Sequence, residues 1–170
     1  MSGIVAYLIT AITILIVHNV INKGAHSREL GIVILTLVLG MTTSVIEQII
    51  VVSGLVTIII SRIDEETTTL FILGITGLLI ITGTKSLILL YIGLEIIGLT
   101  FYVLASRERK GVKSTEAGIK YFILGALSSG ILLLGMSLAY ATTGTTSLEL
   151  VSGASATMIK IGLLFKLGAT

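Results

Sequence analysis

The sequence predicts an all-α membrane protein, a polytopic bundle of transmembrane helices with about six full or short spans and the start of a seventh helix. Hydrophobic residues make up 54% of the 170 residues and charged residues only 12%, whereas a soluble domain has about 25% charged residues. The charges are clustered, and long apolar runs separate them. Such runs are typical of membrane-spanning helices.

The first two apolar runs differ in length. We expect residues 3–20 to form a retained helix, because no basic segment or small-residue cleavage site accompanies them. Residues 30–60 would extend roughly 45 Å as one helix, too long for a hydrocarbon core of about 30 Å without strong tilt. A tight turn at 41–44 is therefore expected, with helices near 29–42 and 45–61.

Basic residues in the loops support the same topology. The positive-inside rule places the 106–115 loop, which carries Arg107, Arg109, Lys110 and Lys113, on the cytoplasmic or matrix side. The loops at 21–29 and 61–69 show a weaker bias to that side. All three loops share a side only if the 30–60 run crosses the membrane twice.

The later helices are easier to place. After the charged loop we expect a span at 70–82, a tight connection at 83–85, and a helix that contains Glu95 and ends at Ala105. A long helix should then run from Glu116 to about Thr142, with Ser114 or Thr115 as its N-cap. A polar loop leads to a final helix that begins near Thr157.

Several kinds of site are disfavoured by composition. The chain has no cysteine, which excludes disulfides, Cys-ligated zinc and iron–sulfur clusters. The two histidines, His18 and His26, are too few for a usual metal or nucleophilic site. A net charge of +2 does not indicate nucleic-acid binding. We expect no cofactor and no metal in this chain.

Glu95 is the charge that most needs an explanation, because its helix is apolar for about three turns on either side. A carboxylate near the bilayer midplane costs roughly 2.5 kcal/mol or more. It needs a charged partner, a water-filled path or its own proton, and each option suits proton or ion transport. Tyr91, Gly98 and Tyr102 share its helix face. The alternative is a neutral carboxyl that only bonds a neighbouring helix.

Three further charges lie in apolar segments. Lys120 is about one turn inside its helix and could either function or extend its ammonium to the interface. Lys166 lies deeper than Lys160, which favours a function for it. Glu47 is interpreted as an interface residue at a helix start. The small residues of the Gly125–Ser129 motif are interpreted as packing signals.

One part of the chain resembles a known family. It consists of YIGLEIIGLTFYVLA (91–105), STEAGIKYFILGALSSGILLLGMSLAY (114–140) and TGTT (143–146). These segments closely resemble the N-terminal half of NADH dehydrogenase subunit 2, an antiporter-like membrane subunit of respiratory complex I. The likeness continues more weakly through GLLFKLGA (162–169). Before residue 70 only the hydropathy pattern agrees.

The resemblance implies a role for three residues. In that family a glutamate of the fifth helix, a lysine of the sixth and a lysine of a broken seventh form a charged axis at mid-membrane, and these positions match Glu95, Lys120 and Lys166. They would form a proton pathway driven by quinone reduction elsewhere in the complex. The chain would thus be a proton-translocating, non-redox subunit of NADH:ubiquinone oxidoreductase. It would divide into N-terminal helices (1–69) and the first part of an antiporter-like repeat (70–170).

The resemblance also implies partners and a location. We expect other membrane-arm subunits of complex I, membrane lipids and the mitochondrial inner membrane, with a bacterial plasma membrane as the alternative. Family members continue with a Pro-Phe-His segment and about seven more helices, an inverted repeat, whereas this sequence stops at Thr170. We hypothesise that a second polypeptide completes the subunit; the alternative is a chain built only in part.

Two other functions stay open at this point. The chain could belong to a stand-alone cation/proton antiporter, whose subunits share ancestry with this family. It could also be a structural membrane subunit whose charges only hold helices together. The Ser114–Tyr140 segment favours the complex I subunit over both.

Overall fold

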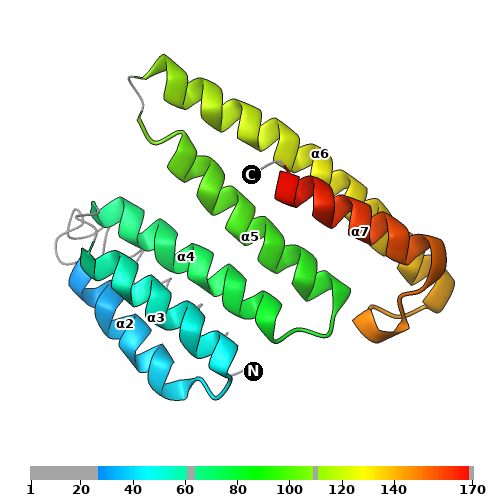
Figure 1. Ribbon diagram of the computed structural model, residues 1–170, viewed down its shortest axis with the longest axis horizontal. Coiled ribbons are helices and arrows are strands. Elements are labelled where there is room, and N and C mark those ends of the chain that lie inside the picture. The colour runs from blue at the N-terminus through cyan, green and yellow to red at the C-terminus, as the bar shows by residue number, and fades with distance from the viewer. Residues whose placement is uncertain (1–26, 61–63, 109–110, 169–170) are drawn as a thin grey trace. The chain divides into compact units, whose positions relative to one another are not determined.

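Helices account for nearly all of the computed structural model, which describes residues 27–60, 64–108 and 111–168. Within these ranges the chain forms six α-helices and one short 3-10 helix (Figure 1). The predicted all-α fold is confirmed. The helix predicted at 3–20 lies outside the described residues. The chain divides into two compact units, one ending at Gly83 and the other beginning at Thr84.

The first unit packs α2 (Ser27–Met41), α3 (Val45–Ile60) and α4 (Glu65–Thr82) against one another. The break after Met41 confirms two helices in the 30–60 run. Arg28 donates hydrogen bonds to the carbonyls of Ile58 (3.2 Å) and Ile59 (2.7 Å). The start of α2 therefore lies beside the end of α3. The guanidinium donates to carbonyls that have no partner within α3, because they belong to its last turn.

The core of the first unit is aliphatic. The buried Thr76 hydroxyl of α4 donates to the carbonyl of Ile72 in its own helix at 2.8 Å, whereas the buried Thr67 hydroxyl has no hydrogen-bond partner among the described residues. The buried members of this core cluster are all aliphatic and include no charged side chain. Its buried members are Leu35, Val38, Val51, Leu55, Ile58, Ile72, Ile75 and Leu79.

Helix α4 begins earlier than predicted and lies in a different unit. The sequence placed a loop at 61–69, but the helix starts at Glu65, with Asp64 as an extended N-cap. The Thr68 amide donates to the Asp64 carbonyl at 3.0 Å, and Glu66 suits the positive end of a helix dipole. The predicted domain division after residue 69 separates α4 from α2 and α3, whereas the structure packs these helices together. Hydropathy marks where an apolar run starts and not which helices it contacts.

The second unit contains α5 (Leu87–Ala105), α6 (Val112–Thr143), the 3-10 helix η1 (Leu148–Leu150) and α7 (Gly153–Gly168). Helix α6 packs against both α5 and α7. It has 32 residues and α7 has 16, so α7 covers only about half of its length (Figure 1). The last residues of α7 consequently lie beside the middle of α6.

The ends of these helices differ from the predicted ends. Helix α6 starts at Val112, so neither Ser114 nor Thr115 is its N-cap. The Ser114 hydroxyl instead donates to the Ala105 carbonyl at 2.9 Å and ties the loop to the end of α5. Helix α7 begins at Gly153, four residues before the predicted Thr157. Gly153 has φ +62°, a left-handed conformation that glycine adopts without steric cost.

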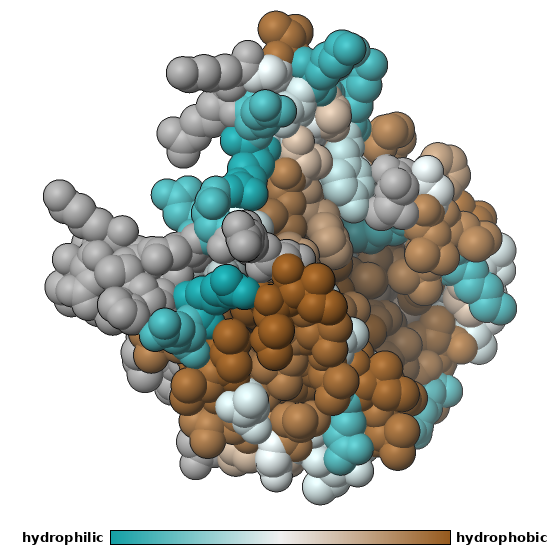
Figure 2. All heavy atoms as spheres, turned by 60° about the vertical axis from the view of Figure 1, so that its left-hand side comes forward, coloured by the Kyte–Doolittle hydropathy of each residue, from teal (hydrophilic) through white to brown (hydrophobic). Residues whose placement is uncertain are grey.

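The outer surface is suited to lipid. Helices α5 and α6 are long and apolar enough to cross a membrane, and α3 and most of α4 are shorter apolar helices. Much of the face seen in Figure 2 is hydrophobic. Exposed side chains include Val45, Ile49 and Ile60 on α3 and Leu127 on α6. Contiguous exposed apolar surface of this kind marks a membrane or protein contact.

Candidate functional site

Three polar side chains from three helices meet in the second unit. The Lys166 ammonium of α7 donates to Glu95 Oε1 of α5 at 2.6 Å and to Ser129 Oγ of α6 at 2.8 Å. The Ser129 hydroxyl donates in turn to the same Glu95 oxygen. Each contact has a charged donor or a charged acceptor, the stronger class of hydrogen bond. The site is thus an ion pair with a bridging hydroxyl.

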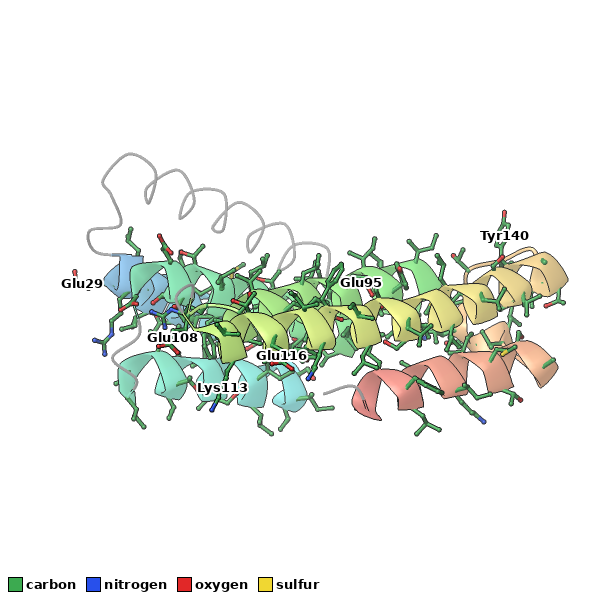
Figure 3. All side chains as sticks on the ribbon, turned by 90° about the horizontal axis from the view of Figure 1, so that it is seen from above. Glu29, Glu95, Glu108, Lys113, Glu116 and Tyr140 are labelled. Carbon is green, nitrogen blue, oxygen red and sulfur yellow. The ribbon has the colours of Figure 1, made fainter. Side chains whose placement is uncertain are left out.

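The ion pair is partly shielded and lies at mid-height of the helices. The side chains of Lys166 and Glu95 are 12% and 28% exposed. In Figure 3, Glu95 lies between one end of the unit, marked by Glu108 and Glu116, and the opposite end, marked by Tyr140. This is the level at which an unpaired charge would cost most in a bilayer. Pairing offsets that cost.

Glycines let α7 approach α6 closely beside the ion pair. A Cβ atom at Gly162, one turn before Lys166, would lie 2.7 Å from the backbone of Leu132. One at Gly135 would lie 2.8 Å from the backbone nitrogen of Ile159. Small residues at such crossings allow backbones of membrane helices to touch. The short separation brings the Lys166 side chain within reach of Ser129.

A tyrosine occupies the corresponding contact between α5 and α6. The Tyr102 hydroxyl lies against Gly125, where a Cβ atom would overlap it. The Tyr102 ring makes edge-on contacts with Tyr121 and Phe122, at centroid distances of 4.7 and 5.7 Å. Gly125 precedes Ser129 by one turn, so the two glycine contacts flank the ion pair. This arrangement confirms that Gly125 is a packing residue.

A pocket of about 510 Å³ adjoins the ion pair. Its wall is mainly apolar. It includes Gly98 and Tyr102, two of the three residues predicted to share the helix face of Glu95. Lys166 is its charged member. The lining residues are Leu94, Ile97, Gly98, Phe101, Tyr102, Tyr121, Gly125, Leu163, Lys166 and Leu167.

Two of the three predicted site residues are brought together and one is not. Glu95 and Lys166 form the ion pair, although 71 positions separate them. Lys120 instead pairs with Glu116 of its own helix at 2.5 Å, and both side chains are mostly exposed. Pairs of this i,i+4 type on an exposed helix face contribute little to stability.

The position of Lys120 along α6 explains this difference. Lys120 precedes Ser129 by nine residues, which corresponds to about 13.5 Å at about 1.5 Å per residue. Tyr140 follows Lys120 by 20 residues, or about 30 Å, close to the thickness of a hydrocarbon core. Exposed lysine and tyrosine side chains suit the two membrane interfaces. Lys120 is therefore at the level of an interface when Glu95 is at the midplane.

Sequence reasoning missed Ser129 as a site residue. It was interpreted as a packing residue because it follows Gly125 at the spacing of a small-residue motif. The available signal was its position, since a polar residue near the middle of a membrane helix needs a partner.

Glu47 is buried and lies in the first turn of α3, where the helix dipole favours a carboxylate. Among the residues described, no group of three His, Cys, Asp or Glu side chains could hold a metal ion.

Comparison with known proteins places the chain in a family. Residues 84–169, just over half of the chain and nearly all of the second unit, match the family model described as "NADH:quinone oxidoreductase/Mrp antiporter, TM". NADH-quinone oxidoreductase subunit N of Jannaschia sp. is 50% identical over 99 residues, which cover 58% of this chain and 20% of the relative. The same subunit of Beijerinckia indica is 37% identical over 161 residues, which cover 81% and 34%.

A solved structure agrees in fold. A chain of respiratory complex I from Thermus thermophilus, determined with bound Aureothin, superposes with a TM-score of 0.82 at 23% identity, over 97% of this chain and 43% of that chain. This chain spans about a third or less of the length of the two curated relatives. From the family match, the chain belongs to the transmembrane NADH:quinone oxidoreductase/Mrp antiporter family.

Proposed function

We propose that the chain is part of a proton-translocating membrane subunit of an NADH:quinone oxidoreductase, and that Glu95 and Lys166 carry protons in it. The observation that supports this most is the Glu95–Lys166 ion pair with its bridging Ser129 hydroxyl, set at mid-height of apolar helices. Ionisable residues inside membrane segments are costly and mark ion or proton pathways by default.

The chemistry of the pair suits proton transfer. In a medium of low dielectric constant each charge stabilises the other, so a proton gained or lost at one group changes the proton affinity of its partner. A change in the field near the pair can therefore move a proton without a cofactor in this chain. The role would be a non-redox one within the enzyme.

Lys120 belongs to the proposed pathway at a different level. Its exposed pair with Glu116 lies about 13.5 Å along α6 from Ser129. A direct hydrogen bond to the central pair would have to span that distance, so water must carry protons between them. We assign Lys120 to the end of the pathway at the interface beside the basic loop.

The relatives guide the remaining assignments. The two relatives are NADH-quinone oxidoreductase subunits N. We propose that this chain is part of the corresponding subunit, which is the counterpart of NADH dehydrogenase subunit 2. Its partners would then be other membrane-arm subunits and lipids. Both relatives are bacterial, which agrees with a bacterial plasma membrane; the mitochondrial inner membrane stays a prediction.

Replacing Glu95 by Gln tests the function. The complex that contains the chain is reconstituted in liposomes, and NADH-driven acidification is followed with a pH-sensitive dye. We expect Glu95→Gln to lower the proton translocation through this subunit more than tenfold, measured per NADH oxidised by the complex. The reason is that the amide cannot exchange a proton. Glu149→Gln, at an exposed ion pair with Lys85, is the control and should leave translocation unchanged.

The same assay separates the alternatives. Full assembly and unchanged translocation in Glu95→Gln would favour a structural subunit and contradict the proposal. Proton movement driven by an imposed Na⁺ gradient without NADH would favour a stand-alone antiporter, a function that the family description also covers. An intact mass of the purified subunit well above 17.9 kDa would contradict a separate second polypeptide.

A further inference from the structure

The Ser129 hydroxyl makes different bonds from those of its helical neighbours. Ser128 donates to the Gly125 carbonyl of its own helix at 2.7 Å, and Thr100 donates to the Ile96 carbonyl at 2.8 Å. Such local bonds are the usual fate of serine and threonine hydroxyls inside helices. Ser129 instead donates to Glu95 and accepts from Lys166, on two other helices.

The surroundings of Ser129 hold it in this position. The residue is only 5% exposed, and the glycine contacts that draw α5 and α7 towards α6 lie one turn away on either side, at Gly125 and Gly162. These contacts bring α5 and α7 close enough to α6 for Glu95 and Lys166 to reach the serine oxygen. Its place between the two charges is thus set by backbone packing.

We propose that Ser129 is a positioning residue for proton exchange at the Glu95–Lys166 pair, whose hydroxyl holds the pair in its ionised form and remains bonded when the pair is neutral. This inference rests on the proposed function. A hydroxyl both donates and accepts, a carboxylate only accepts, and an ammonium only donates. Ser129 therefore satisfies both charged groups at once.

Ser129 Oγ can also form hydrogen bonds with both groups when the pair is neutral. When one proton passes from the Lys166 ammonium to the Glu95 carboxylate, the products are an amine and a carboxylic acid, and no proton is gained or lost overall. The acid O–H can then donate to Ser129 Oγ, while the serine hydroxyl turns to donate to the amine lone pair. This arrangement requires the hydrogen of the new acid and that of the serine hydroxyl to turn, and alanine at this position would lose both sets of bonds.

The test compares Ser129→Ala with Ser129→Thr, which keeps the hydroxyl, and with Ser128→Ala as the matched control. Removing a hydrogen bond to a charged group corresponds to at least roughly a tenfold effect. In the reconstituted complex we expect Ser129→Ala to slow proton translocation about tenfold and to move its pH profile by about one unit. Ser129→Thr and Ser128→Ala should stay within about twofold of the wild type.

A second measurement reports on Glu95 without requiring transport. In infrared spectra of the same complex, the band of the protonated Glu95 carboxyl is assigned by its loss in Glu95→Gln. Because the carboxyl loses its hydrogen bond to the serine hydroxyl, the frequency of this band should shift in Ser129→Ala. Tyr91 and Tyr102 of α5 and Tyr121 of α6 are the nearby titratable groups, and substituting each by Phe shows that the shift is not theirs.

The outcomes are distinct. An unshifted carboxyl band and pH profile in Ser129→Ala would overturn the inference, and so would equal losses in Ser128→Ala or Ser129→Thr, which would indicate a packing effect. If Ser129→Ala does not assemble, Ser129→Cys, with a weaker donor of similar size, is measured instead under the same criteria. A shifted band together with full translocation in Glu95→Gln would support the role of Ser129 at the pair and overturn the proposed function alone.

Discussion

Helices α2–α4 meet over aliphatic side chains, whereas α5–α7 meet over glycines, a tyrosine and an ion pair. The first unit buries branched side chains such as Leu35 and Ile58 completely, and its buried Thr76 hydroxyl bonds to its own helix. The second unit brings Glu95, Ser129 and Lys166 together across three helices. One apolar sequence can therefore build a bundle with an aliphatic core and, next along the chain, a bundle that holds an ion pair across three helices.

The difference shows how a membrane protein can hold a charge. Aliphatic packing tolerates small shifts, because methyl groups repack at modest cost. An ion pair does not, because its stabilisation depends on atoms within hydrogen-bond distance. The second unit uses contacts between backbones, such as that of Gly162 with Leu132, which bring α6 and α7 close together beside the ion pair.

The largest expected effect comes from breaking the ion pair. Lys166→Met would leave the Glu95 carboxylate with the Ser129 hydroxyl in an apolar setting, and should lower the free energy of unfolding by roughly 3–5 kcal/mol. The double variant Glu95→Gln/Lys166→Met should recover part of this loss. Titration of the purified chain with SDS in mixed micelles measures the difference. Lys160→Met, at an exposed lysine of the same helix, should change stability by less than about 0.5 kcal/mol.

A double variant as unstable as Lys166→Met would contradict this account. The loss would then come from missing packing of the lysine stem and not from an unpaired carboxylate. The interior of each unit would in that case be stabilised by the same kind of apolar packing.

An intermediate effect is expected at the glycine contacts. Gly162→Ala would meet the Leu132 backbone, which cannot move away without separating α6 from α7, and should cost about 1–3 kcal/mol. Gly54→Ala in the first unit would meet the end of the flexible Ile75 side chain and should cost less. Gly130→Ala, with no atom within 4 Å, should be neutral or stabilising. SDS titration of all three variants gives the comparison, and equal losses at Gly162 and Gly54 would contradict it.

The smallest effect is expected at the surface of the second unit. Lys85 and Glu149 form an ion pair at 2.8 Å with side chains 83% and 67% exposed. Lys85→Gln should cost only about 0.2–1 kcal/mol, and the cost should vanish at about 1 M salt, where screening acts over roughly 3 Å. If Lys85→Gln lost the same stability at low and high salt, the Lys85–Glu149 pair would resemble the Glu95–Lys166 pair more than its exposure indicates.

Several features of the fold could be predicted locally. The turn between α2 and α3 follows from the length of the apolar run and from the polar residues that interrupt it. The early start of α4 was not predicted, because a run of threonines reads as a loop by hydropathy while Asp64 and the glutamates after it suit a helix start. The position of Lys120 one turn inside its helix fits either a function or a place at the interface, and the resemblance places it with Glu95 and Lys166; its pairing with Glu116 differs from that prediction.

The sequence by itself determined the all-α membrane fold, most helix positions and the choice of Glu95, Lys120 and Lys166 as charges that require an explanation. These are local properties, because hydropathy, length and charge can be counted along one segment. Only the tertiary structure decided that Glu95 bonds to Lys166 through contacts shared with Ser129, and that Lys120 pairs with Glu116. Those pairings depend on where three helices touch, and glycine contacts between distant segments set that point.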